Sequence, residues 1–269
     1  MGPERSAARA PPLCLFATRG LLYRCMGPLK DEAVVVRLTE FSETSQIVSV
    51  FSLGHGQLRL IAKGARRSTK QRFAAGLDLL ELGEVGFIPA HGDAQLGTLT
   101  EWVQRDAFAG LRRELVRLYA GLYAVELVAY LTEEGDPHPE LFRALVETLR
   151  ALGGDAPAAP LVPAFQSDLL RAIGYAPNLE QCMGCGRPVA RGGPVFFSAG
   201  AGGLLCRDCE AHYVEKWRVS PRLLGTTTRT GDPALWFELL DYHLTHIAGR
   251  RFKTAEQLGA LLVPPRAAP

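Results

Sequence analysis

Four of the six cysteines form two Cys-x2-Cys pairs, Cys182 with Cys185 and Cys206 with Cys209, and twenty residues separate the pairs. Each pair can present two thiolates from one tight turn, and together they complete a tetrahedral set of four sulfurs. Such a set is typical of Zn²⁺ in a closed structural site, because no ligand position is left for substrate or water. The spacing therefore predicts one structural zinc ion per chain.

The segment between the pairs, residues 186–205, is rich in glycine and proline and contains two short apolar runs, Val195–Phe197 and Gly203–Leu205. This pattern predicts a zinc-ribbon hairpin in which Gly184 and Gly186 allow the close backbone approach of a knuckle. So small an apolar core cannot order the module alone, and metal binding must supply much of its stability. Two alternatives remain: iron in a rubredoxin-like site, or cysteines that form disulfides or stay unrelated thiols.

Length and composition limit what the rest of the chain can be. With 269 residues, of which 47% are hydrophobic and 22% charged, the sequence predicts a globular protein of two domains plus the metal module. No apolar run approaches the roughly eighteen residues that a membrane span needs. The formal net charge of +2 is small, but the cations are unevenly distributed, and that distribution is more informative than the sum.

The first 25 residues carry four arginines against one acid, with Leu13–Phe16 as an apolar core that is too short for a secretory signal. We expect residues 1–25 to be a disordered leader or an extension ahead of a start at Met26. Cys14 and Cys25 lie outside the two pairs and are expected to be free thiols. Because no secretory context accompanies these cysteines, we expect a cytoplasmic protein.

Between Ala33 and Gln104 the sequence predicts five short strands separated by turn signals. Gly54–Gly56 joins the second strand to the third by a hairpin, and one longer excursion follows the third. Five such strands fit a small closed barrel of the oligonucleotide-binding type (OB-fold), with an SH3-like barrel as the nearest alternative. The predicted strands are Ala33–Leu38, Gln46–Ser52, Gln57–Ala62, Leu79–Ile88 and Leu96–Trp102.

Positive charge concentrates around the excursion, where residues 59–72 contain six cations and no acid. A basic loop at the mouth of a barrel can follow a phosphate backbone while a flanking aromatic stacks on a base. The alternative is a solvated loop without a ligand, which six uncompensated cations beside such a barrel make the weaker interpretation. The candidate DNA-binding residues are Arg37, Arg59, Lys63, Arg66, Arg67, Lys70, Arg72 and Phe73.

After Trp102 the apolar residues recur at spacings of three and four, which predicts helices. Asp232 is a suitable N-cap, Pro233 fits a first helical turn, and Gly249 can end that helix. Tyrosines on one face of the first helix are expected mostly in the core. The predicted helices are Ala107–Thr132, Glu140–Leu152, Val162–Ile173 and a C-terminal helix from Asp232 to Ile247, with a linker over residues 153–160.

The helical part offers weaker functional signals. His243 and His246 lie three residues apart, but without a further ligand in register they are expected to be packing or surface residues. No Ser-His-Asp arrangement, phosphate-binding loop, His-Glu-x-x-His motif or acidic pair suited to nuclease metals is present, so the sequence argues against an enzyme. Four arginines could extend the basic surface, although helix solvation is the slightly preferred interpretation: Arg105, Arg112, Arg113 and Arg117.

Several stretches are more specific together than singly. They are Leu38–Glu43, Ile61–Arg67, Leu169–Pro177, the two cysteine pairs, Gly202–Cys206, and His243–Arg250 followed by Lys253. In this order they resemble the RecO family of bacterial recombination mediators over nearly all of Met26–Leu262. One departure follows the basic loop, where relatives often have Gln-Pro-Phe and this chain has Ala75-Gly76-Leu77. Any role for an aromatic at that point is therefore in doubt.

The resemblance implies an α+β multidomain protein: an N-terminal five-stranded OB-fold β-barrel, followed by an α-helical domain with an inserted four-cysteine zinc-ribbon module. It also implies a cytoplasmic, nucleoid-associated role in annealing DNA strands and loading the recombinase at DNA gaps. Expected partners are single- and double-stranded DNA, RecR and the acidic C-terminal tail of the single-strand-binding protein. The expected boundaries are 26–104 for the barrel, 105–180 for the helical domain, 181–212 for the zinc module and 213–269 for C-terminal helices.

The residues alone leave three functions open. The first is a non-catalytic DNA binder that anneals strands and passes DNA to a recombinase. The second is an RNA-binding or ribosome-associated module, because a barrel with a zinc ribbon also occurs in that setting. The third is a structural adaptor whose zinc module binds protein. The family resemblance favours the first.

Overall fold

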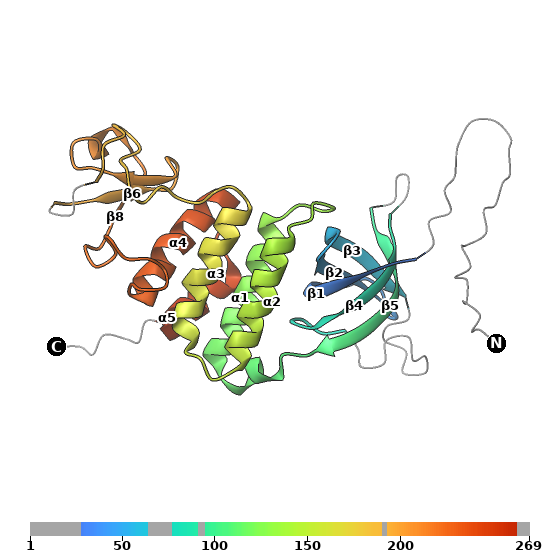
Figure 1. Ribbon diagram of the computed structural model, residues 1–269. Coiled ribbons are helices and arrows are strands. Elements are labelled where there is room, and N and C mark those ends of the chain that lie inside the picture. Colours follow the sequence, from blue (N-terminus) through green and yellow to red (C-terminus); the bar gives the residue numbers. More distant parts are fainter. Residues whose placement is uncertain (1–27, 64–76, 91–94, 190–192, 263–269) are drawn as a thin grey trace, which may run out of the picture.

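The computed structural model describes residues 28–63, 77–90, 95–189 and 193–262. A β-barrel lies at one end, a layer of helices occupies the middle, and the cysteine-bearing module lies at the other end against α4 (Figure 1). The predicted leader and residues Arg66 to Phe73 of the basic loop lie outside the described residues. Within the described ranges, no helix is both long and apolar enough to cross a membrane.

The N-terminal sheet is a closed barrel with the strand order β1-β2-β3-β5-β4. β1 closes it by pairing antiparallel with both β2 and β4, and β3 runs parallel to β5 at the pairs Leu60/Gly97 and Ile61/Thr98. This confirms the predicted five-stranded barrel of the oligonucleotide-binding type. The strands are β1 Leu29–Glu40, β2 Ser45–Ser52, β3 Gly56–Lys63, β4 Leu82–Ile88 and β5 Gly97–Asp106.

The fourth strand begins three residues later than predicted, at Leu82. Leu80 has φ 66°, in the left-handed region that a strand cannot contain, and its N–H donates to the backbone oxygen of Val35. The Leu80 side chain is buried where barrel and helices meet. Tertiary packing therefore overrides the apolar run of residues 79–82, from which the sequence predicted an earlier start.

Three consecutive valines of β1 are buried because the strand lies between two cores, and a β-bulge occurs between Val35 and Arg37. Val35 belongs to the core inside the barrel, whereas Val34 and Val36 belong to the core shared with the helices. The extra residue of a bulge shifts the alternation of side chains. Arg37 is thereby placed on the outer face of the strand, where it is exposed.

The single helix predicted for residues 107–132 is wrong. Phe108 has φ 43° and begins a separate 3-10 helix, Ala109–Arg113, and Glu114 is extended before α1 starts at Leu115. Phe108 and Leu111 are buried in the shared core, and a Cβ on Gly110 would lie 2.0 Å from the backbone oxygen of Gly153. This close approach of two backbones leaves no room for a side chain at residue 110, and the apolar periodicity does not reveal it.

The remaining helices pack α2 on α3, α3 on α4 and α1 on α5. α3 begins at Ala158, inside the predicted linker; Pro160 lies in its first turn, where a proline costs no hydrogen bond, and Pro163 lies inside the helix. α4 begins and ends as predicted: Asp232 accepts from the N–H groups of Ala234 and Leu235, and Gly249 has φ 64°. The helices are α1 Leu115–Leu131, α2 Pro139–Gly153, α3 Ala158–Ala172, α4 Pro233–Ala248 and α5 Lys253–Leu262.

Candidate metal centre and nucleic-acid interface

The four cysteines predicted to bind metal come together. Their sulfur atoms all lie within 4.8 Å of one another, and Cys185 Sγ is 3.9 Å from Cys206 Sγ. Four sulfurs around Zn²⁺ at about 2.3 Å form a tetrahedron whose edges are about 3.8 Å long. The cluster therefore has the size and donor set of a four-thiolate metal site, and iron would suit it geometrically as well.

Backbone hydrogen bonds shape the first knuckle. The N–H of Cys182 donates to the oxygen of Arg187, and the N–H of Gly186, at φ 71°, donates to the oxygen of Cys182. A Cβ on Gly184 would lie 2.9 Å from the Cβ of Cys209, so a larger residue would push the knuckles apart. Both glycines that the sequence marked are thus required, one for its backbone angle and one for space.

The cysteine thiols differ in their pKa values. Burial acts to raise the pKa of Cys182, but N–H groups of Cys206, Cys185 and Gly184 outweigh it and lower the pKa to about 6. The pKa of Cys209 is raised to about 12, first by Cys206 and then by burial and the other two sulfurs. One thiol of the cluster therefore loses its proton easily, whereas the repulsion between thiolates opposes ionisation of all four. A divalent cation would offset this repulsion.

The module is a small sheet of the order β7-β6-β8 that packs on α4. The ring of Phe197 on β6 is buried and meets the ring of His243 edge to face, with centroids 5.4 Å apart. Trp217 on β8 contacts Tyr242 in the same way at 5.5 Å. The module is therefore attached to the helical core by aromatic contacts. Its elements are β6 Phe196–Ser198, β7 Gly203–Leu205, the 3-10 helix Glu210–His212 and β8 Trp217–Arg218.

Two of the predicted DNA-binding residues lie side by side on the outer face of the barrel. Arg37 on β1 and Arg59 on β3 are both strand partners of Ser49 on β2. Directly paired residues point to the same side of a sheet, so the two arginines flank Ser49 about 10 Å apart. Both are exposed, and Arg59 Nε lies 3.5 Å from Glu134 Oε1.

Lys63 extends this surface at the end of β3, because residues four apart on a strand share a face. It is exposed and pairs in register with Ser45 at the start of β2. The helices cover the other half of the outer face, where Phe51 contacts Phe142 of α2 with ring centroids 6.1 Å apart. We call the open half, with the exposed Arg37, Arg59 and Lys63 and the buried Ser49 between the two arginines, the basic barrel face.

The four arginines predicted as weaker candidates do not form one surface, and Arg105 lies on strand β5 rather than on a helix. Arg105 faces Glu84 at 3.5 Å, Arg112 pairs with Asp78 at 2.8 Å, and Arg113 is exposed. Arg117 has a side chain only 11% exposed, and its guanidinium donates to backbone oxygens at the C-terminal end of α2. Its donors are therefore used within the fold.

Sequence reasoning missed a basic and aromatic cluster beside Arg37. Tyr130, predicted to be core like most tyrosines of its face, is 40% exposed at the end of α1. The guanidinium carbon of Arg250 lies 4.2 Å from its ring centroid and that of Arg37 lies 6.0 Å away. Such arrangements are typical of cation–π contacts. Arg250-Arg251 directly after Gly249 was the only signal in the sequence.

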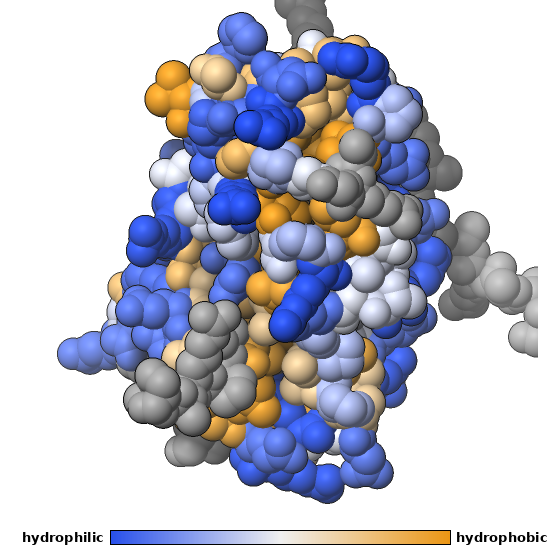
Figure 2. Space-filling model, turned by 90° about the vertical axis from the view of Figure 1, so that its left-hand side faces the viewer, coloured by the Kyte–Doolittle hydropathy of each residue, from blue (hydrophilic) through white to orange (hydrophobic). Residues whose placement is uncertain are grey.

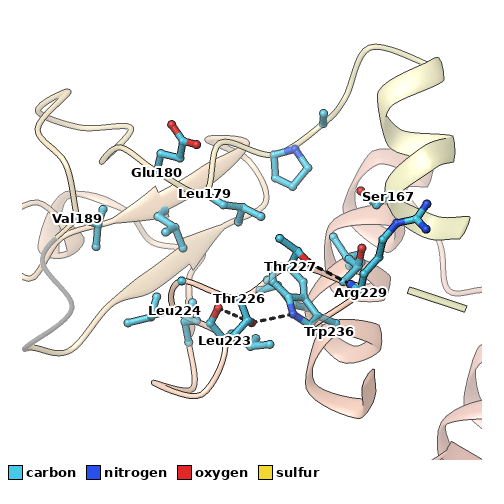
Figure 3. Close-up of a pocket in the computed structure, with 18 of the residues that line it drawn as sticks. Ser167, Leu179, Glu180, Val189, Leu223, Leu224, Thr226, Thr227, Arg229 and Trp236 are labelled. Carbon is cyan, nitrogen blue, oxygen red and sulfur yellow. Dashed lines mark hydrogen bonds between the residues drawn. The ribbon is translucent and has the colours of Figure 1, made fainter. Parts of the chain in front are cut away.

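A cavity of about 870 Å³ lies between α3, α4 and the cysteine module. Trp236 Nε1 donates to Thr226 Oγ1 at its base, and Arg229 lies at the side nearest Ser167 (Figure 3). The view onto the module, α4 and α5 shows hydrophobic residues gathered between hydrophilic ones (Figure 2). The apolar lining includes Leu179, Val189, Leu204, Leu223, Leu224 and Trp236, and the charged lining is Arg171, Glu180 and Arg229.

The fold and the sites define a class: a multidomain protein that joins an OB-type barrel to a helical domain with a four-cysteine module. Two family models match the chain: "Recombination protein O N terminal" over residues 26–108 and "Recombination protein O C terminal" over residues 112–249. The chain therefore belongs to the RecO family. This membership supports a role in DNA repair and recombination.

Curated relatives carry the name DNA repair protein RecO. That of Pelobacter propionicus is 32% identical over 246 residues, which are 87% of this chain and 97% of the relative. That of Rhodopirellula baltica is 38% identical over 178 residues, 66% of this chain and 65% of the relative. That of Anaeromyxobacter sp. strain K is 36% identical over 184 residues, 68% of this chain and 71% of the relative.

Proposed function

We propose that this protein is a non-catalytic mediator of DNA repair and homologous recombination. In this proposal it binds single- and double-stranded DNA, anneals complementary strands and helps load a recombinase onto DNA coated by single-strand-binding protein. The basic barrel face is the observation that carries the proposal, because it presents two arginines across Ser49 and leads through Lys63 into a segment with four more cations. Membership of the RecO family supports it.

The proposed cationic DNA-binding residues act on the phosphates, and Phe73 is proposed to stack on a base. Arginine and lysine on a sheet face neutralise the backbone without reading sequence. Arg250 joins the set because it lies with Arg37 around Tyr130, and Arg105, Arg112 and Arg113 are secondary candidates. The primary set predicted from the sequence, to which Arg250 is added, is Arg37, Arg59, Lys63, Arg66, Arg67, Lys70, Arg72 and Phe73.

The four-cysteine cluster is proposed to hold one structural Zn²⁺. Its sulfurs have the spacing that tetrahedral zinc needs, and four thiolates leave no open position for chemistry. We further propose that residues 26–104, 105–180, 181–212 and 213–269 act as the barrel, helical, zinc and C-terminal units, with two changes of boundary: β5 extends the barrel to Asp106, and β8 extends the zinc module to Arg218. We also propose a cytoplasmic, nucleoid-associated location, which a DNA repair role supports.

For partners we propose RecR and the acidic, apolar C-terminal tail of single-strand-binding protein. The cavity between α3, α4 and the module suits the tail, because an apolar floor with Trp236 and Leu224 is accompanied by Arg171 and Arg229. Arg171 pairs with Asp168, which leaves Arg229 as the cation for an acidic peptide.

Strand annealing tests the proposal. Complementary strands, bare or coated with single-strand-binding protein, should anneal faster with the wild-type protein than with an Arg66→Glu/Arg67→Glu variant. DNA and RNA of equal sequence compete in a parallel binding assay. Preference for RNA would favour a ribosome-associated module, and partner binding without any nucleic-acid affinity would favour an adaptor.

The tail is tested separately by fluorescence anisotropy of a labelled tail peptide at low salt. Arg229→Glu should weaken peptide binding, whereas Arg222→Glu, also exposed but outside the cavity lining, should not. Equal binding to both variants would remove the cavity as the docking site. No binding to the wild-type protein would remove this partner.

A further inference from the structure

Phe41 is a large apolar side chain held out into solvent. It lies in the turn between β1 and β2 and is 57% exposed, the highest value among the exposed aromatic residues in the described part of the chain. Phe51, near the other end of β2, is by comparison fully buried. The β1–β2 turn of an OB-type barrel borders the strand face on which such barrels bind oligonucleotides.

The turn that carries Phe41 is ordered by its own hydrogen bonds. The N–H groups of Phe41 and Ser42 both donate to the backbone oxygen of Ser45, at 3.3 and 3.0 Å. The N–H of Ser45 in turn donates to Ser42 Oγ at 3.1 Å. The aromatic ring is therefore presented from a defined backbone, which lowers the entropy lost when a ligand binds.

Phe41 lies close to the cations of the basic barrel face. Ser45, to which it is hydrogen-bonded, is the strand partner of Lys63. Two strand spacings thus separate the backbones of Phe41 and Lys63, or about 10 Å. Glu40 and Glu43 flank Phe41 in the sequence, so the turn suits a base better than a phosphate.

We propose that Phe41 is a stacking residue for an unpaired base of single-stranded DNA whose phosphates lie along the basic barrel face. The inference rests on the proposed DNA-binding function and adds a residue that distinguishes single strands from duplexes. Stacking needs an exposed base plane, which a duplex does not offer in its interior. It also tolerates any sequence, because every base has such a plane.

Affinity measurements on matched strands and duplexes test the inference. Phe41→Ala should weaken binding of single strands by roughly 5- to 150-fold and leave duplex binding unchanged. The dependence of affinity on salt should keep its slope, because no cation is removed. Phe41→Trp should bind like the wild type, and fluorescence of the new indole should fall when single strands bind. Leu115→Ala, at a residue 58% exposed outside the barrel, is the control.

A strand with an abasic site at each position in turn identifies the base concerned. The wild type should bind one such strand more weakly, and Phe41→Ala should show no further loss on it. If Arg59→Glu weakens DNA binding while Phe41→Ala does not, the stacking role is wrong and the proposed function stands. Equal losses on single strands and duplexes would also overturn it. A wild-type protein that binds no DNA would overturn both proposals.

Discussion

The guanidinium of Arg117 on α1 donates a 2.9 Å hydrogen bond to the backbone oxygen of Leu152 near the C-terminal end of α2. The same nitrogen lies 2.7 Å from the oxygen of Gly154 and 3.0 Å from that of Ala156, and Nε pairs with Glu114 at 3.0 Å. The last carbonyls of a helix lack partners inside it, and a cation there also suits the helix dipole. Arg117 therefore joins α1 to the turn that connects α2 with α3.

Replacing Arg117 should destabilise the protein without changing its DNA contacts. Arg117→Ala leaves backbone oxygens without their charged donor, and we expect the free energy of unfolding to fall by about 1–3 kcal/mol. Arg113→Ala, at an exposed neighbour, should change it by less than about 0.5 kcal/mol. Urea unfolding measures both. A loss of DNA affinity in Arg117→Ala at unchanged stability would contradict the structural role.

Removing one sulfur should unfold the module but spare the barrel. Cys182→Ser deletes the buried ligand, and because binding energy in such a site is folding energy, we expect a fall in Tm of about 10 °C or more. Cys25→Ser, outside the two pairs, is the matched control and should bind one metal ion per chain like the wild type. Metal analysis and calorimetry give the result. If the wild-type protein contains no metal and Cys182→Ser has the same Tm as the wild type, the zinc site is refuted. If metal analysis finds iron, the site is an iron site instead.

The sequence predicted those parts of the structure that depend on local signals. The cysteine pairs define their own cluster, and the Asp232-Pro233 start and Gly249 end of α4 follow from backbone chemistry at single residues. The barrel followed from five β-runs and one long excursion. In each case the deciding residues are close in the chain.

What the sequence could not show depends on contacts between distant segments. The break before α1 accompanies contacts with Gly153 and the shared core, which are far away in the chain, and the late start of β4 at Leu82 accompanies the hydrogen bond from Leu80 to Val35. That Arg37 and Arg59 lie on either side of Ser49 can be predicted only from the strand register, including the bulge before Arg37. Apolar periodicity carries no such information, so Arg117 looked like a solvated helix residue.

Acidification should weaken the contact between α4 and the cysteine module through His243. Its Nε2 donates a 3.0 Å hydrogen bond to the backbone oxygen of Tyr175. Its Nδ1 is buried and has no hydrogen-bond partner among the described residues. Burial lowers the pKa of His243, and His246 lowers it further. The hydrogen bond to Tyr175 and the charge of Glu215 act to raise the pKa, but the lowering effects dominate. The unfolded chain therefore binds the proton more readily than the folded protein.

The sign of the effect follows from that difference. The stability contributed by neutral His243 is present above the ordinary histidine pKa of about 6.5 and is lost as the pH falls below it towards the folded-state value. One proton gives a slope of at most about 1.4 kcal/mol per pH unit. His243→Gln keeps an amide donor for Tyr175 but cannot titrate, so its unfolding free energy should change less between pH 7 and 5.5. Equal pH dependence in both proteins would assign the effect to other groups.

The DNA affinity of the basic barrel face should fall when its arginines are removed and rise when the charge of Glu134, the partner of Arg59, is removed. Each phosphate contact on a single strand releases about 0.7 counterion, so Arg37→Ala and Arg59→Ala should each make the slope of log affinity against log salt shallower by about that amount. Affinity should fall alike on mixed-sequence and homopolymer strands, because phosphate contacts do not read bases.

Glu134 supplies the opposite change at the same place. Its carboxylate lies 3.5 Å from Arg59 Nε, and both side chains are about half exposed, so DNA must compete with it for the arginine. Glu134→Gln removes the competing charge, and we expect affinity to rise by roughly 1.5- to 5-fold, the range of an exposed ion pair. In an Arg59→Ala background the same substitution should have a smaller effect. Salt titrations of the two single variants and the double variant measure this coupling. If none of these variants changes affinity or slope, DNA binds elsewhere, and Arg105, Arg112 and Arg113 become the residues to test.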